Sequence, residues 1–182
     1  MSALRDSVLG AAGFTAAAAI VFGTVAFGEA RMVGALGLGG AYGVWVALFL
    51  VVATALLAPL GGDSRARRAI AVRFPLAFLA YAALWCVAWF LRPDKLGEVL
   101  GAIAGTAALA TILSAGQSAR DRRRGAVVLL VGNAIGYFVG DALHTALGRP
   151  LGMVLWGSTF GIGTGAPLGW IIGAPRRAAG ED

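Results

Sequence analysis

The chain has 182 residues, of which 59% are hydrophobic and only 13% carry a charge. Because about a quarter of the residues of a soluble domain are charged, this composition excludes an ordinary soluble fold and favours an all-α integral membrane protein. The net charge of +6 lies almost wholly outside the apolar stretches, so we interpret it as a topology signal and expect no nucleic-acid partner.

Six apolar stretches are long enough to cross a bilayer as helices: residues 8–27, 33–60, 74–91, 96–115, 125–147 and 151–173. The first follows a short polar start that contains Arg5. A cleaved signal peptide is the alternative, but its apolar core would be longer than the usual length of about 7–15 residues. A short turn at 28–32 leads into the second stretch, which begins with several glycines and must tilt or become irregular.

The third stretch is rich in aromatic residues. Phe78, Tyr81, Trp85 and Trp89 follow one another at helical spacing. We expect them to form a lipid-facing or packing surface, and the alternative is one wall of a hydrophobic ligand pocket.

The last stretch has a glycine at every fourth position, a spacing that lets helix backbones approach closely. Pro167 falls inside this stretch. It predicts a kink or a short unwound segment at 163–167.

Positive charge is unequal between the two ends of these spans. With six spans, the two termini and the basic loops at 61–73 and 118–124 share one side, which holds eleven Lys and Arg residues against four on the other. The positive-inside rule predicts that both termini are cytoplasmic. The expected fold is a single domain over residues 1–182, a compact bundle of six transmembrane helices with short loops.

A polar stripe marks the fifth stretch. Asn133, Tyr137, Asp141 and His144 fall within about 80° of one another on a helix, with glycines beside them. An ionised carboxylate in the middle of a membrane helix costs about 2.5–3.5 kcal/mol, so Asp141 should face a cavity or a partner. The candidate partners near the outer end of the helix are His144, Arg31, Arg92, Lys95 and Arg149.

We interpret the stripe as one wall of a polar, outward-facing cavity that binds a small solute, an ion or a proton. Asp141 would supply charge, His144 a titratable group, and Asn133 and Tyr137 hydrogen bonds. The candidate ligand-binding or pore-lining set also includes Trp156, Thr164 and Glu98. The alternative is structural, with Asp141 paired to an arginine that pins two helices together and His144 in the headgroup region.

The sequence has no phosphate-binding loop, no hydrolase motif and no cysteine–histidine cluster, and its single Cys and single His exclude an intrachain disulfide and a bis-histidine haem. It therefore specifies no cofactor. The first hypothesis is a small transporter, channel or substrate-binding subunit in the cell membrane. One alternative is a non-catalytic subunit that docks on a larger complex, or on copies of itself, through glycine-rich faces. The other is a membrane enzyme with Asp141 and His144 as acid and base on a lipid-like substrate.

Overall fold

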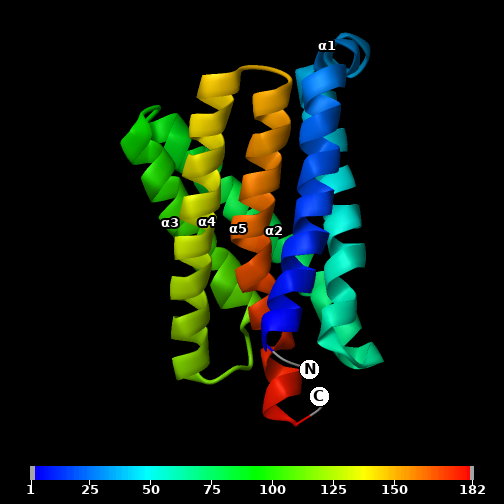
Figure 1. The fold of residues 1–182 in the computed structure, drawn as a ribbon, viewed down its shortest axis with the longest axis vertical. Coiled ribbons are helices and arrows are strands. Elements are labelled where there is room, and N and C mark those ends of the chain that lie inside the picture. The colour runs from blue at the N-terminus through cyan, green and yellow to red at the C-terminus, as the bar shows by residue number, and fades with distance from the viewer. Residues whose placement is uncertain (1–2, 181–182) are drawn as a thin grey trace.

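The computed structural model describes residues 3–180, which form a helical bundle without β-strands in that range (Figure 1). The described chain is 92% helical. Its elements are α1 (Ala3–Leu57), a 3-10 turn η1 (Ala58–Gly61), α2 (Ser64–Leu91), α3 (Lys95–Leu113), α4 (Ala119–Leu147) and α5 (Leu151–Ala178). Four of them, namely α1 continued by η1, α2, α3 and α4, are long and apolar enough to cross a membrane. The prediction of an all-helical fold is confirmed.

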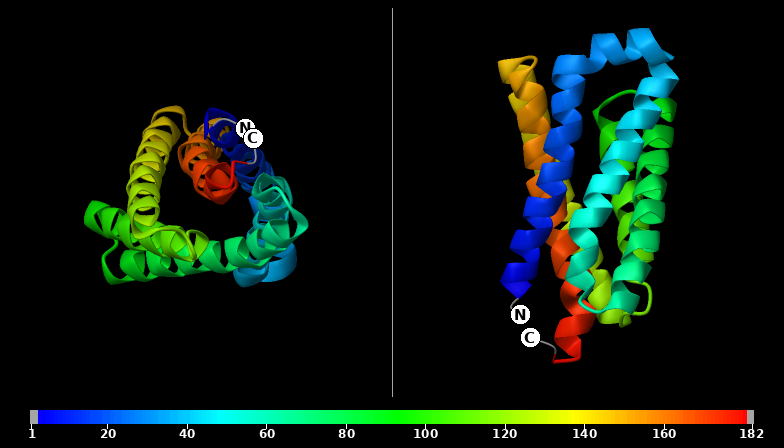
Figure 2. Two further views of the ribbon diagram at one scale, coloured as in Figure 1. Left: turned by 90° about the horizontal axis from the view of Figure 1, so that it is seen from below. Right: turned by 90° about the vertical axis from the view of Figure 1, so that its right-hand side faces the viewer.

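The long helix α1 is not a straight rod: it rises, crosses the end of the bundle opposite the termini as a short helical segment, and then descends (Figure 2). Gly37 is the residue of α1 whose backbone is not helical. Gly37 has φ 69° and ψ 170°, a combination that is essentially restricted to glycine. The two halves of α1 lie side by side, and the rings of Phe14 and Phe49 are 5.1 Å apart. The turn expected at 28–32 is helical instead, since glutamate, alanine, arginine and methionine all favour helix there.

Helix α5 lies between α1 and α4 and packs glycines against both (Figure 1). On the α1 side, a Cβ atom on Gly165 would lie 2.5 Å from the carbonyl oxygen of Gly10. On the α4 side, a Cβ atom on Gly136 would lie 2.5 Å from the carbonyl oxygen of Thr159. Only glycine allows helix backbones to approach this closely. The glycines that recur every four residues in α5 are therefore packed inside the bundle.

The helical conformation of α5 continues through Pro167, so the unwound segment expected at 163–167 does not form. The proline ring lies against α4 at Gly132, where a Cβ atom would come within 2.8 Å of the ring. A proline inside a helix removes one backbone hydrogen bond and crowds the preceding turn. The contacts of α5 with helices on both sides hold it helical despite that loss.

Both basic segments expected as loops form the first turns of helices. Helix α2 begins at Ser64, and the Asp63 carboxylate accepts a hydrogen bond from the Ala66 amide at 2.7 Å. Helix α4 begins at Ala119, and the Ser118 hydroxyl lies 3.2 Å from the amide nitrogen of Asp121. Such caps satisfy amide groups that the first turn of a helix leaves open. Both segments start at the end of the bundle that carries the two termini (Figure 1).

The apolar core is built around Phe14, whose side chain is fully buried. Its ring meets those of Phe49, Phe74 and Phe160 edge-on, at centroid distances of 5.1, 6.3 and 5.7 Å. Edge-on aromatic pairs stabilise a core beyond the area that they bury. This cluster joins both halves of α1 to α2 and α5.

A buried ion-pair cluster joins the beginning of α1 to the end of α5. Asp6 is fully buried, and its carboxylate accepts a hydrogen bond from Arg176 at 2.6 Å and another from Arg177. A Cβ atom at Gly173 would collide with this carboxylate, so glycine makes room for it. A buried carboxylate needs such partners, because burying the charge alone is costly. The sequence pattern alone does not predict this cluster, because Asp6 and the two arginines lie at opposite ends of the chain.

We expect Gly136→Ala to lower the midpoint of thermal unfolding, because overpacking a tight contact typically costs about 1–3 kcal/mol. The control is Gly43→Ala, since among the described residues only the neighbouring backbone of its own helix lies near a Cβ atom there. That control should be neutral or gain up to about 1 kcal/mol, because alanine is the better helix former. Circular dichroism on heating measures both, and equal midpoints would show that the glycine contact is not needed.

We expect Asp6→Asn to reduce the free energy of unfolding by about 3 kcal/mol or more, because it leaves two partly buried arginines without their counter-charge. The matched control is Glu29→Gln. Glu29 pairs with Arg149 at 2.6 Å, but the two side chains are 36% and 44% exposed, so its loss should cost at most about 1 kcal/mol. Equilibrium denaturation of the three proteins gives both values. Equal losses would mean that burial of the Asp6 cluster is unimportant.

Candidate functional site

The polar residues of α4 separate into two groups along the helix. At the end opposite the termini, the Asp141 carboxylate lies 2.8 Å from the ammonium nitrogen of Lys95, the first residue of α3. The same nitrogen lies 2.9 Å from Glu98, whose side chain is only 11% exposed. Two carboxylates therefore share one cation, which ties α3 to α4. This geometry matches the structural alternative for Asp141, with a lysine in place of an arginine.

The connection between α2 and α3 positions that lysine. Asp94 caps α3, with one carboxylate oxygen 3.0 Å from the Gly97 amide nitrogen and the other 2.9 Å from Arg92 Nε. These two interactions lower the pKa of Asp94 below its ordinary value. The cap therefore contributes fully above the ordinary carboxyl pKa and is lost as the pH falls through the lowered one.

About two turns before Asp141 in α4, Asn133 is fully buried at the meeting point of α2, α4 and α5. Its side-chain nitrogen donates to Thr164 Oγ1 at 3.0 Å and to Tyr81 Oη at 3.4 Å. Its oxygen Oδ1 is buried and has no hydrogen-bond partner within residues 3–180. Because Tyr81 accepts from Asn133, its own hydroxyl hydrogen remains available. Thr164 likewise accepts from Asn133 and donates to no other group among the described residues, so the network holds two free hydroxyl donors and one free acceptor, Asn133 Oδ1.

Tyr81 also borders an apolar cavity of about 200 Å³ between α1, α2, α4 and α5. Six aromatic rings line this space: Phe22, Tyr81, Trp85, Tyr137, Trp156 and Phe160. The Tyr137 ring lies 5.5 Å from Trp156 and 6.0 Å from Trp85, and neither pair is parallel. The exposed residue Cys86 also lines the cavity, so the space opens at the surface of α2. We call it the aromatic cavity.

Four of the predicted site residues belong to this region. Tyr137 and Trp156 line the aromatic cavity directly. Asn133 and Thr164 reach it through their hydrogen-bond network with Tyr81. The helical periodicity of α4 was enough to put Asn133 and Tyr137 on one face.

The other three predicted residues lie apart from the cavity lining. Asp141 and Glu98 are engaged by Lys95. His144 does not line the cavity, but its ring stacks on the lining residue Trp156 at a centroid distance of 5.5 Å. The space beside the stripe is therefore apolar, because the carboxylate of α4 turns towards α3.

The residues that were not singled out are mostly aromatic. Phe22 and Phe160 carried no polar signal and come from helices distant in sequence. Tyr81 and Trp85 belonged to the aromatic series of α2, whose alternative interpretation was the wall of a hydrophobic pocket. Phe78 of the same series packs in the core instead, and Trp89 stacks on Trp85 at 5.9 Å.

Within residues 3–180, no three His, Cys, Asp or Glu side chains are grouped so that they could hold a metal ion. Comparison with protein-family models, with curated proteins and with solved structures finds no match to this chain.

We expect Lys95→Met and Asp141→Asn to show a coupling of about 0.2–1 kcal/mol in a double-mutant cycle, because the two side chains form an ion pair that is partly open to solvent. Lys95→Met should be the more destabilising single change, since it also removes the counter-charge of Glu98. The coupling should shrink in high salt. Lys95→Met combined with Glu29→Gln serves as the uncoupled control. Zero coupling between Lys95 and Asp141 would show that this ion pair does not contribute to stability.

Proposed function

We propose that this chain is a membrane protein with six spans, formed by the two halves of α1 and by α2 to α5. The four long apolar helices and the reversal of α1 support this count (Figure 2). Large apolar side chains are exposed along the bundle, as at Val51, Val72 and Ile135, which suits contact with lipid. Both termini and both arginine-rich helix starts lie at one end, which favours a cytoplasmic location for that end (Figure 1).

Within that membrane fold, we propose that the aromatic cavity binds a small uncharged solute. The observation that carries this proposal is a space of about 200 Å³ walled by six rings from four helices, with a free hydroxyl donor at its edge. An apolar cavity of about 150 Å³ is enough to hold a benzene molecule. The volume therefore suits one aromatic ring with a small polar substituent.

The lining chemistry favours a neutral ligand over an ion. None of the described residues that line the cavity carries a charge. The polar end is supplied by Tyr81, which can donate its hydroxyl hydrogen, and by Asn133, whose free oxygen lies in the same network. A few placed polar groups in an apolar pocket orient a ligand and select it. The opening at Cys86 would let an apolar solute enter from the lipid.

The alternative, docking on a larger complex through glycine faces, has less support. The recurring glycines of α5 are covered by α1, and Gly163 of the same helix is covered by α4. Glycines with open space around them occur mainly in α1, for example Gly34, Gly39 and Gly43. We therefore favour a transporter or substrate-binding subunit that handles a small solute.

The test is saturable binding of 4-bromophenol to the detergent-solubilised protein, followed by quenching of tryptophan fluorescence. We expect Ala82→Phe to abolish saturable binding, because Ala82 lines the cavity and the new ring would fill it. The matched control is Ala83→Phe, which adds the same ring at an exposed neighbouring position and should bind normally. Bromobenzene should bind about two- to tenfold more weakly than 4-bromophenol, since it lacks the hydroxyl.

The contradicting outcome is quenching that rises linearly with concentration and is the same in all three proteins. That result would indicate simple partitioning into the micelle. Thermal unfolding of both variants confirms that a loss of binding is not a loss of fold.

A further inference from the structure

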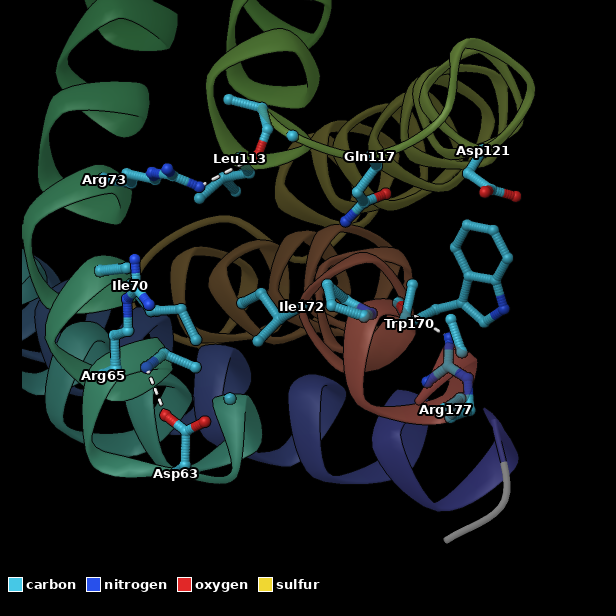
Figure 3. A pocket seen from close by; sticks show the side chains of 18 of the residues that line it. Asp63, Arg65, Ile70, Arg73, Leu113, Gln117, Asp121, Trp170, Ile172 and Arg177 are labelled. Atoms are coloured by element: carbon cyan, nitrogen blue, oxygen red, sulfur yellow. Dashed lines mark hydrogen bonds between the residues drawn. The ribbon is translucent and has the colours of Figure 1, made fainter. Parts of the chain in front are cut away.

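A second and larger cavity lies at the end of the bundle that carries the termini (Figure 3). It has a volume of about 970 Å³ and lies between the first turns of α2, the α3–α4 connection and the last turns of α5. It shares no lining residue with the aromatic cavity. Its size is at the upper end of the range of about 300–1,000 Å³ for small-molecule sites. We call it the basic cavity.

Three arginines give this cavity its charge. The side chain of Arg65 makes no hydrogen bond or ion pair within residues 3–180, so its guanidinium group is free. Arg73 donates one hydrogen bond to the Ala115 carbonyl oxygen at 3.1 Å and keeps its other donors. Arg177 pairs with Asp6, a carboxylate that a second arginine also contacts.

The two carboxylates that line the cavity are already engaged. Asp63 accepts from the Ala66 amide at 2.7 Å, as the cap of α2. Asp121 accepts from the Ser118 hydroxyl at 2.6 Å, in the first turn of α4. Within the described chain neither carboxylate forms an ion pair with a lining arginine, so the guanidinium groups of Arg65 and Arg73 remain open to an anion.

The inner surface of the cavity is apolar. Ile70, Leu113, Ile172 and Trp170 line it, and the Trp170 ring lies 5.7 Å from the guanidinium carbon of Arg177 (Figure 3). An apolar surface next to cationic groups suits a ligand that has an anionic end and an apolar end.

Gln117 adds an unpartnered acceptor. Its side-chain nitrogen donates to the Ile171 carbonyl oxygen at 3.0 Å, which fixes the side chain on α5. Its oxygen Oε1 is buried and has no partner among the described residues. A buried acceptor without a partner is costly, so a ligand hydroxyl that donates to it would gain affinity.

We propose that the basic cavity binds a phosphate-bearing molecule that also has a hydroxyl group and an apolar part. Arg65 and Arg73 hold the phosphate through charge-assisted hydrogen bonds. Gln117 accepts the hydroxyl hydrogen, and Trp170 covers the apolar part. An anionic lipid headgroup and a soluble nucleotide offer the same chemistry. This site is independent of the aromatic cavity and of the solute proposed for it.

Binding is tested on the full chain with two probes, phosphatidylglycerol by native mass spectrometry and AMP by isothermal titration calorimetry. The variant is Arg65→Gln with Arg73→Gln. The control is Arg67→Gln with Arg68→Gln, which removes the same charge from the same helix at positions outside the cavity lining. The two double variants also lose the same kind of structural contact, because Arg67 and Arg73 each donate one hydrogen bond to a backbone carbonyl.

We expect the cavity variant to lose at least about tenfold in affinity for one probe while the control retains it, because charge-assisted hydrogen bonds are the strong ones. Loss for phosphatidylglycerol identifies a lipid ligand, and loss for AMP identifies a soluble one. Ala69→Phe, which narrows the cavity and leaves every charge in place, should weaken the same probe. Binding of 4-bromophenol should be unchanged in all of these variants.

The proposal is overturned if neither probe binds the unmodified chain, or if both arginine pairs reduce binding equally. Equal reduction would mean that the total positive charge at this end of the bundle attracts the probe and that the basic cavity does not bind it specifically. Normal affinity in Ala69→Phe, with the fold intact by thermal unfolding, would also exclude the cavity.

Discussion

The close approach of the α5 backbone to α1 and α4 is the constraint on which the rest of the structure depends. Glycines on two sides of α5 remove the side chains that would otherwise hold the three helices apart. This spacing brings the Trp156 ring of α5 to 5.9 Å from Phe22 of α1 and to 5.5 Å from Tyr137 of α4. Where large aromatic rings stand in place of glycines, the helices are held further apart. The aromatic cavity lies in the space that this leaves.

Much of the fold could be predicted from the sequence because helices in an apolar chain are set by local composition. The reversal of α1 could not, since residues 33–43 contain five glycines and nothing local distinguishes Gly37 from its neighbours. The basic segment at 61–73 was expected to be a loop because it is charged. Arginine nevertheless favours helix, and the Asp63 cap is enough to start α2 at Ser64.

The candidate site was predictable only as far as one helix determines it. Periodicity placed Asn133 and Tyr137 on one face of α4, but the sequence could not tell which partner Asp141 would meet. That choice depends on how closely α3 approaches α4, which is a matter of tertiary packing. The aromatic cavity was hidden for the same reason, because its walls come from four separate helices and its residues are ordinary packing residues when taken one at a time.

The Asp6 cluster has a consequence for how the protein is made. Arg176 follows Asp6 by 170 positions, so the pair forms only after almost all of the intervening chain has been synthesised. Until then, an unpaired carboxylate opposes the burial of the first turn of α1. The contact between the start of α1 and the end of α5 can therefore gain this ion pair only after α5 has been made. A nascent chain that stops before the end of α5 lacks Arg176 and Arg177. In such a chain, the carboxylate of Asp6 disfavours burial of the first turn of α1.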